Sequence, residues 1–153
     1  MITVPWGCTI IMSPAENKAI VRRFFEQAWS QGDLAVVDEL VATNSDNASP
    51  DELPGTAGIK QFIAMYRTGM PDTRMTVQDQ IAEGDRVATH WSGEGTHQGE
   101  FMGIAPTGKR VTVRGISLYR LADGKIVEGY DAWDKLELTE QLGDTPRLRV
   151  RGG

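Results

Sequence analysis

The fold is decided by residues 111–143, VTVRGISLYRLADGKIVEGYDAWDKLELTEQLG, in which two apolar runs flank a turn. Asp123-Gly124 is typical of two-residue hairpin turns, because both residue types tolerate the positive φ angles that such turns require. The residues on either side alternate between apolar and polar character, as half-buried strands do. The stretch therefore predicts an antiparallel hairpin that pairs 111–121 with 126–133.

The turn also predicts which side chains share a face of this hairpin. If Ala122 lies opposite Lys125, regular alternation places Asp134 at the end of one face. Asp131 then lies on the other face, where Arg114 can pair with it. The face of Asp134 is apolar with small residues at its middle, which suits a pocket wall; it comprises Val113, Gly115, Ser117, Tyr119, Leu121, Ile126, Glu128, Tyr130, Ala132 and Asp134. A slip of one residue would exchange the faces, so this prediction depends on the register.

The first half of the chain is predicted to be helical. Ser13 and Glu16 form a capping-box pattern around Pro14, and apolar residues then recur at helical spacing up to Gly32. The next segments are expected to be a short helix over 34–41, a polar loop over 44–54 and a third helix over 56–68.

The apolar pattern changes from helical to alternating after residue 70. Strands are expected over 75–81 and 87–96, and a short helix over 136–142 closes the fold. Bulges or strong curvature are expected near three glycines: Gly93, Gly95 and Gly99. Helices followed by strands predict an α+β fold, with the helices packed on one face of a curved antiparallel sheet.

The length of 153 residues fits one domain. We expect this domain to span 13–143, with a loose N-terminal extension over 1–12 and a basic C-terminal tail over 144–153. The extension is apolar but too short to cross a bilayer, so no membrane partner is expected.

Charge and cysteine content argue against several classes of protein. The net charge is −5 and no basic field is present, which argues against a nucleic-acid partner. Cys8 is the single cysteine, so the chain has no intramolecular disulfide, and a reducing, cytoplasmic location is expected. One cysteine and two histidines argue against a zinc site.

The order and spacing of several short motifs resemble the SnoaL-like polyketide cyclases, also called ester cyclases, of the NTF2-like superfamily. The likeness runs from about residue 12 to residue 143. The motifs that carry it are AWSQGD at 28–33, GIKQF at 58–62, GTHQGEFMGI at 95–104, PTGK at 106–109, YR at 119–120, DGKIVE at 123–128 and the 134–143 end.

This resemblance implies a cone-shaped fold, in which a curved antiparallel sheet of four or more strands and the helices enclose one deep pocket. It also implies ring closure by intramolecular aldol chemistry, with a carboxylate as acid and base and with no metal or organic cofactor. The expected partners are a small apolar carbonyl substrate and a second copy of the chain in a homodimer.

Four residues are candidates for the acid–base chemistry. Asp134 matches the acidic residue of the family most readily, although it could equally cap the closing helix. Asp131 is the second candidate, with an ion pair to an arginine as the alternative role. His90 and His97 are candidate proton shuttles, and each could instead be a hydrogen-bonded wall residue. The candidate substrate-binding residues are Trp29, Tyr66, Trp91, Phe101, Ser117, Tyr119 and Tyr130.

Three functions are compatible with these residues. The first is a cofactor-free cyclase that removes a proton next to a carbonyl group and closes a ring. The second is a small-molecule-binding or dimerisation module that keeps the pocket without catalysis. The third is an epoxide hydrolase or isomerase on the same fold, for which hydrolysis would require a second carboxylate and an arginine around a water molecule.

Overall fold

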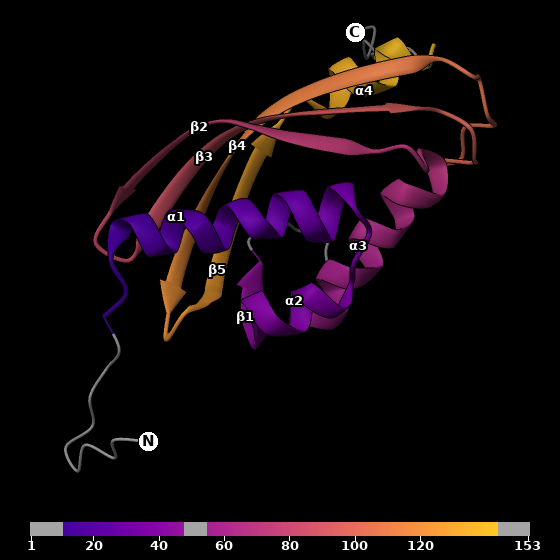
Figure 1. Cartoon of the computed structure of the whole chain (residues 1–153). Helices are drawn as coiled ribbons and strands as arrows, with labels where there is room; N and C mark the ends of the chain where they lie inside the picture. Colours follow the sequence, from indigo (N-terminus) through magenta and orange to yellow (C-terminus); the bar gives the residue numbers. More distant parts are fainter. Residues whose placement is uncertain (1–10, 48–54, 144–153) are drawn as a thin grey trace, which may run out of the picture.

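The structure, a computed structural model, describes residues 11–47 and 55–143, in which helices pack on a five-stranded sheet (Figure 1). The expected tail over 144–153 lies outside the described residues, as do all but two residues of the expected extension over 1–12. No helix in the described ranges is long and apolar enough to cross a membrane.

The first helix begins at the predicted capping box. In α1 (Pro14–Arg23) the Ser13 backbone N–H donates to Glu16 Oε2 at 2.8 Å, and the Glu16 N–H donates to Ser13 Oγ at 3.1 Å. The helix continues as a π-helical segment, η1 (Phe24–Ser30), and π-helical turns are frequent at functional sites. After Gly32 the short helix α2 (Ala35–Leu40) follows, as predicted.

The segment expected as a polar loop over 44–54 is in part a strand. β1 (Val41–Asn47) pairs in parallel with β5, and its register is irregular between Val41 and Asp46. The sequence VATNSDN lacks the alternation of a half-buried strand, and β1 lies at the edge of the sheet beside β5. The third predicted helix is present as α3 (Gly55–Gly69).

The four predicted strands form an antiparallel meander. They are β2 (Arg74–Glu83), β3 (Arg86–Thr96), β4 (Arg110–Ala122) and β5 (Lys125–Trp133), followed by the closing helix α4 (Lys135–Gln141). The sheet order is β1-β5-β4-β3-β2, so the parallel strand β1 makes the sheet mixed. The predicted α+β class is confirmed, and the parallel fifth strand is the addition to it.

The hairpin has the predicted turn but not the predicted register. Asp123 and Gly124 both have positive φ angles, of 52° and 75°, and Ala122 pairs with Lys125 as expected. A bulge then follows, because Leu121 pairs with Ile126 whereas Arg120 pairs with Glu128. The bulge adds one residue to β5 and reverses the face of every β5 side chain beyond it.

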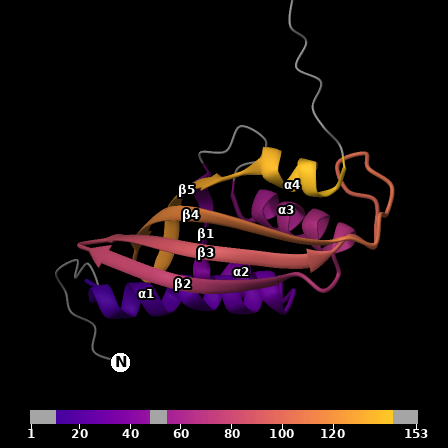
Figure 2. The same ribbon diagram turned by 90° about the horizontal axis from the view of Figure 1, so that it is seen from above.

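The sheet curves over the helices and leaves its inner face to the core. Figure 1 shows β2, β3 and β4 arching over α1 and α3, and Figure 2 shows α1 running alongside β2. The main core cluster joins this inner face to α1, η1 and α2, with Phe25, Trp91 and Tyr119 among its members.

The glycines expected to cause bulges have another role. The irregularities of the meander lie between Val77 and Asp79 and between Arg120 and Leu121, not at Gly93 or Gly95. A Cβ atom at Gly93 would lie 2.7 Å from Met75 Sδ, and one at Gly95 would lie 2.9 Å from Met70 Cβ. These glycines therefore make room for side chains above the sheet.

Candidate functional site

One apolar pocket lies between the inner face of the sheet and the helices. The space between its walls, counted out to the open mouth, is about 1080 Å³. Its walls are formed by Phe24, Phe25, Trp29, Val41, Ile59, Phe62, Tyr66, Met70, Thr73, Met75, Trp91, Gly93, Glu94, Gly95, Val111, Val113, Ser117, Tyr119, Ile126, Gly129, Asp131, Trp133 and Leu138.

Aromatic rings form two walls of this pocket. Near α3 the Tyr66 ring lies 4.9 Å from that of Phe62 and 5.9 Å from that of Trp133. Towards η1 the Phe25 and Tyr119 rings are stacked, with centroids 6.1 Å apart and planes 10° from parallel. Such walls suit a flat, apolar ligand, because aromatic faces stack on one another.

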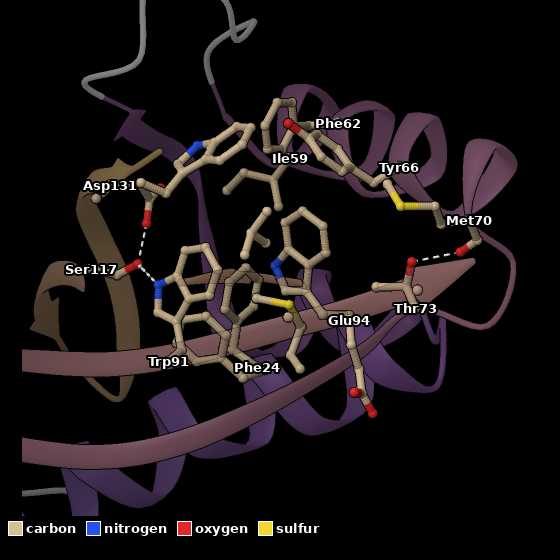
Figure 3. Close-up of a pocket in the computed structure, with 18 of the residues that line it drawn as sticks. Phe24, Ile59, Phe62, Tyr66, Met70, Thr73, Trp91, Glu94, Ser117 and Asp131 are labelled. Carbon is tan, nitrogen blue, oxygen red and sulfur yellow. Dashed lines mark hydrogen bonds between the residues drawn. The ribbon is translucent and has the colours of Figure 1, made fainter. Parts of the chain in front are cut away.

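A chain of hydrogen bonds crosses the floor of the pocket and ends at Asp131. Trp91 Nε1 donates to Ser117 Oγ at 2.8 Å, and the Ser117 hydroxyl donates to Asp131 Oδ1 (Figure 3). The Tyr119 hydroxyl donates to the same oxygen at 3.1 Å. Ser117 is fully buried, and Trp91 and Tyr119 nearly so. The bulge in β5 creates this network, because it places Asp131 directly opposite Ser117.

Burial raises the pKa of Asp131 above its ordinary value, and the hydrogen bonds from Ser117 and Tyr119 oppose this shift in part. Asp131 taken as a whole residue is exposed to solvent, but its carboxyl group is surrounded by protein atoms. We attribute the raised pKa to these surroundings, because hydration of the carboxylate itself decides the equilibrium. Glu94, the other acid among the wall residues that the structure describes, pairs with Arg110 at 3.0 Å and points away from the rings (Figure 3).

The prediction that Asp134 faces the pocket and Asp131 points away is wrong. Asp134 is the N-cap of α4, where its Oδ1 accepts the Glu137 N–H at 2.8 Å, and it does not line the pocket. No ion pair joins Asp131 to Arg114 within the described residues. The cause is the bulge, which exchanges the faces of the two aspartates.

Neither histidine lines the pocket. His90 lies on the outer face of β3 and is exposed, opposite Asp79 and Ile116. His97 is fully buried beyond the pocket, and its Nδ1 accepts the Thr107 backbone N–H at 3.2 Å. His97 therefore holds the loop between β3 and β4 in place, and the expected position of either histidine beside the substrate is wrong.

The expected substrate-binding residues divide into two groups. Trp29, Tyr66, Trp91, Ser117 and Tyr119 line the pocket. Regular alternation predicts the inner face for Tyr130. It lies beyond the bulge, however, and is 59% exposed on the outer face. Phe101 is buried behind the wall, with its ring centroid 4.8 Å from that of Tyr66.

Trp133 is a further pocket residue. Regular alternation from the turn would place it on the outer face together with Asp131, and the bulge turns both side chains inwards. Apolar residues at helical spacing in α3 indicated a buried face, but not that Ile59 and Phe62 would face a cavity. Among residues 11–47 and 55–143, no group of three His, Cys, Asp or Glu side chains is arranged to hold a metal ion.

A curved mixed sheet that covers helices and encloses an apolar pocket is the architecture of the NTF2-like class of fold. The family model of the SnoaL-like polyketide cyclases matches residues 19–142. The chain belongs to this family, as its motifs indicated.

Solved structures of the family have the same fold. AclR from Streptomyces galilaeus, described as a candidate hydroxylase, is 34% identical with a TM-score of 0.79, over 88% of this chain and 100% of AclR. IdmH from Streptomyces antibioticus, described as a candidate polyketide cyclase, is 30% identical with a TM-score of 0.72, over 84% of this chain and 99% of IdmH. TsrD from Streptomyces laurentii is 25% identical with a TM-score of 0.80, over 86% and 98% of the two chains. The comparison with curated proteins finds no match.

Proposed function

We propose that this protein is a cyclase that closes a ring in a polyketide-like carbonyl compound, with Asp131 as its acid and base. The observation that carries the proposal is the position of Asp131, a carboxylate in an apolar pocket whose Oδ1 accepts two hydroxyl hydrogen bonds. A raised pKa makes a carboxylate a stronger base, and an apolar site strengthens its interaction with a developing charge.

The proposed reaction is an intramolecular aldol addition that needs no cofactor. Asp131 removes a proton from the carbon next to one carbonyl group, which leaves an enolate. The enolate carbon attacks a second carbonyl carbon of the same molecule, so that a carbon–carbon bond forms and the carbonyl π bond breaks. The resulting alkoxide takes up the proton that Asp131 carries. The aromatic walls support this step, because they can hold the reacting carbons in contact.

The test compares Asp131→Asn with Asp134→Asn on a candidate linear or partly cyclised polyketide. Asp131→Asn keeps the size of the side chain and a hydrogen-bond acceptor but removes the base, so the rate of cyclisation should fall by roughly 10²–10⁴. Asp134→Asn is the matched control, because asparagine caps a helix about as well as aspartate and the side chain lies outside the pocket. Normal turnover by Asp131→Asn would refute the carboxylate mechanism.

Product analysis of the wild-type protein separates the alternatives. The likeness to AclR makes hydroxylation the second candidate, and it would give a product that contains one more oxygen atom. An isomerase would give an uncyclised isomer of the substrate, and an epoxide hydrolase would give a diol. A binding module would retain the ligand without turnover.

We further infer that the protein forms a homodimer through the outer face of its sheet. Ile81, Leu118 and Tyr130 lie in one row across this face and are 40–69% exposed, and Ile116 lies in the next row. The adjacent polar row contains two acids and two bases, so that two copies do not repel each other; it comprises Glu83, Arg86, Arg120 and Glu128. An exposed apolar patch within a balanced polar surround suits association with a second copy.

A further inference from the structure

We propose that Trp91 is a positioning residue for the base, because its indole N–H fixes the direction in which the Ser117 hydroxyl donates. This inference rests on the proposed function of Asp131. It assigns to Trp91 a role beyond forming an aromatic wall: Trp91 decides which oxygen of Asp131 is occupied and which one meets the substrate.

The argument begins with the donors and acceptors. An indole nitrogen can only donate, whereas a serine hydroxyl donates one hydrogen and accepts through its lone pairs. Because Ser117 Oγ accepts from Trp91 Nε1 at 2.8 Å, the hydroxyl hydrogen points to its other partner, Asp131 Oδ1. Tyr119 donates to the same oxygen, so Oδ2 is the oxygen left for a substrate proton.

The fold holds Trp91 rigidly in the orientation that this role requires. Trp91 lies on β3 opposite Gly115 of β4, and a Cβ atom at Gly115 would lie 2.4 Å from Trp91 Cζ2. On its other side the Trp91 ring lies 6.2 Å from that of Phe25. A rigid donor loses little conformational entropy when it orders its acceptor, so the direction of the Ser117 hydroxyl is set before any substrate binds.

The chain of donors also affects the basicity of Asp131. Donation by the indole N–H polarises the hydroxyl, which then donates more strongly to the carboxylate. This favours the ionised form and opposes the effect of burial on the pKa. Removal of the indole N–H should therefore raise the pKa of Asp131. Among the described residues of the pocket walls, the other titratable side chains are Tyr66, Tyr119 and Glu94, and none of them is changed by this removal.

The experiment is a titration of the Asp131 carboxyl carbon by NMR in four proteins: wild type, Trp91→Phe, Ser117→Ala and the double variant. Trp91→Phe should move the titration to higher pH, and the same substitution should have no effect when Ser117 is already alanine. An unchanged titration in folded Trp91→Phe would overturn the proposal. An equal shift in both backgrounds would also overturn it, because the effect would then come from packing.

Two further variants keep the test decisive if Trp91→Phe does not fold. Benzothienylalanine at position 91 keeps the shape of the ring but replaces the N–H group with sulfur, so it should reproduce the shift. Trp133→Phe is the matched control, because Trp133 is a second pocket tryptophan outside the chain of hydrogen bonds. It should shift the titration of Asp131 less than Trp91→Phe does. The titration needs no substrate, so its outcome is separate from whether Asp131 catalyses a cyclisation.

Discussion

Two aspartates of this protein have pKa values displaced in opposite directions. Asp72 accepts the Thr96 backbone N–H at 2.7 Å and the Thr96 hydroxyl at 2.8 Å, and these bonds lower its pKa. Burial raises the pKa of Asp131. The native state therefore favours the ionised form of Asp72, whereas ionisation of Asp131 makes the native state less stable. Such a cost is typical of residues retained for function.

Substitution of these aspartates by asparagine should therefore change stability with opposite signs. A carboxyl group whose pKa is lowered on folding stabilises the native state at pH values above its unfolded pKa of about 3.9. This stabilisation is lost as the pH falls through the folded pKa. Asp72→Asn should lower the melting temperature at pH 7, with a smaller effect in acid. A group with a raised pKa destabilises the native state as the pH rises through its folded pKa. Asp131→Asn should raise the melting temperature at pH 7 and not in acid. Thermal unfolding across this pH range checks both, and equal signs at pH 7 would contradict the assignment.

The β4–β5 hairpin is the element that builds the site, and Gly115 is a position where its packing is very close. A Cβ atom there would lie 2.4 Å from Trp91 Cζ2 and 2.8 Å from both the Ala132 carbonyl oxygen and Trp133 Cβ. A residue without a side chain at this position lets Trp91 and Trp133 both lie close to β4. The hairpin thus orders one wall of the pocket through a single close approach.

Gly115→Ala should destabilise the protein by about 1–3 kcal/mol, the usual cost of overpacking a core. Part of the strain is against backbone, which relaxes less easily than a side chain. Arg114→Ala is the matched control, one residue earlier on β4 with its side chain exposed, and it should stay within about 0.5 kcal/mol of wild type. Denaturant unfolding followed by tryptophan fluorescence measures both. Equal stability of the two variants would mean that the inner face accommodates a methyl group at 115.

The whole molecule presents two faces of its sheet to different surroundings. The inner face forms the pocket, and the outer face carries the exposed apolar side chains for which a homodimer is proposed. The same strands form both faces, so residues of the inner and outer faces alternate along β4. Leu118 of the outer face, for example, is adjacent to Ser117 of the inner face. A dimer through the outer face would therefore stiffen the strands that carry the proposed base.

Leu118→Lys should convert the proposed dimer to a monomer, because it places a charge at the centre of the outer apolar row. Thr112→Lys is the matched control, an exposed position on the same strand away from that row. Sedimentation equilibrium over a range of concentrations measures the state of each. A wild-type protein that stays monomeric would refute the homodimer, and a dimer that persists in Leu118→Lys would move the interface to another surface.

Four features were predictable from the chain alone, because local propensity and short-range alternation decide them: the α+β class, the capping box at Ser13, the four antiparallel strands and the Asp123-Gly124 turn. It also carried the family motifs. Strand β1 was not predictable, since its parallel pairing with β5 comes from a neighbour distant in the chain.

Which aspartate faces the pocket depends instead on the pairing of β4 with β5. A bulge adds one residue, Val127, between Ile126 and Glu128, and the nearby glycine, Gly129, lies two positions after the added residue and does not mark it. Because side chains alternate with a period of two, this residue turns Asp131 and Trp133 inwards and Tyr130 outwards, and leaves Asp134 to cap α4. The bulge is a property of how β4 and β5 pair with each other, so local propensity along either strand does not determine where it falls.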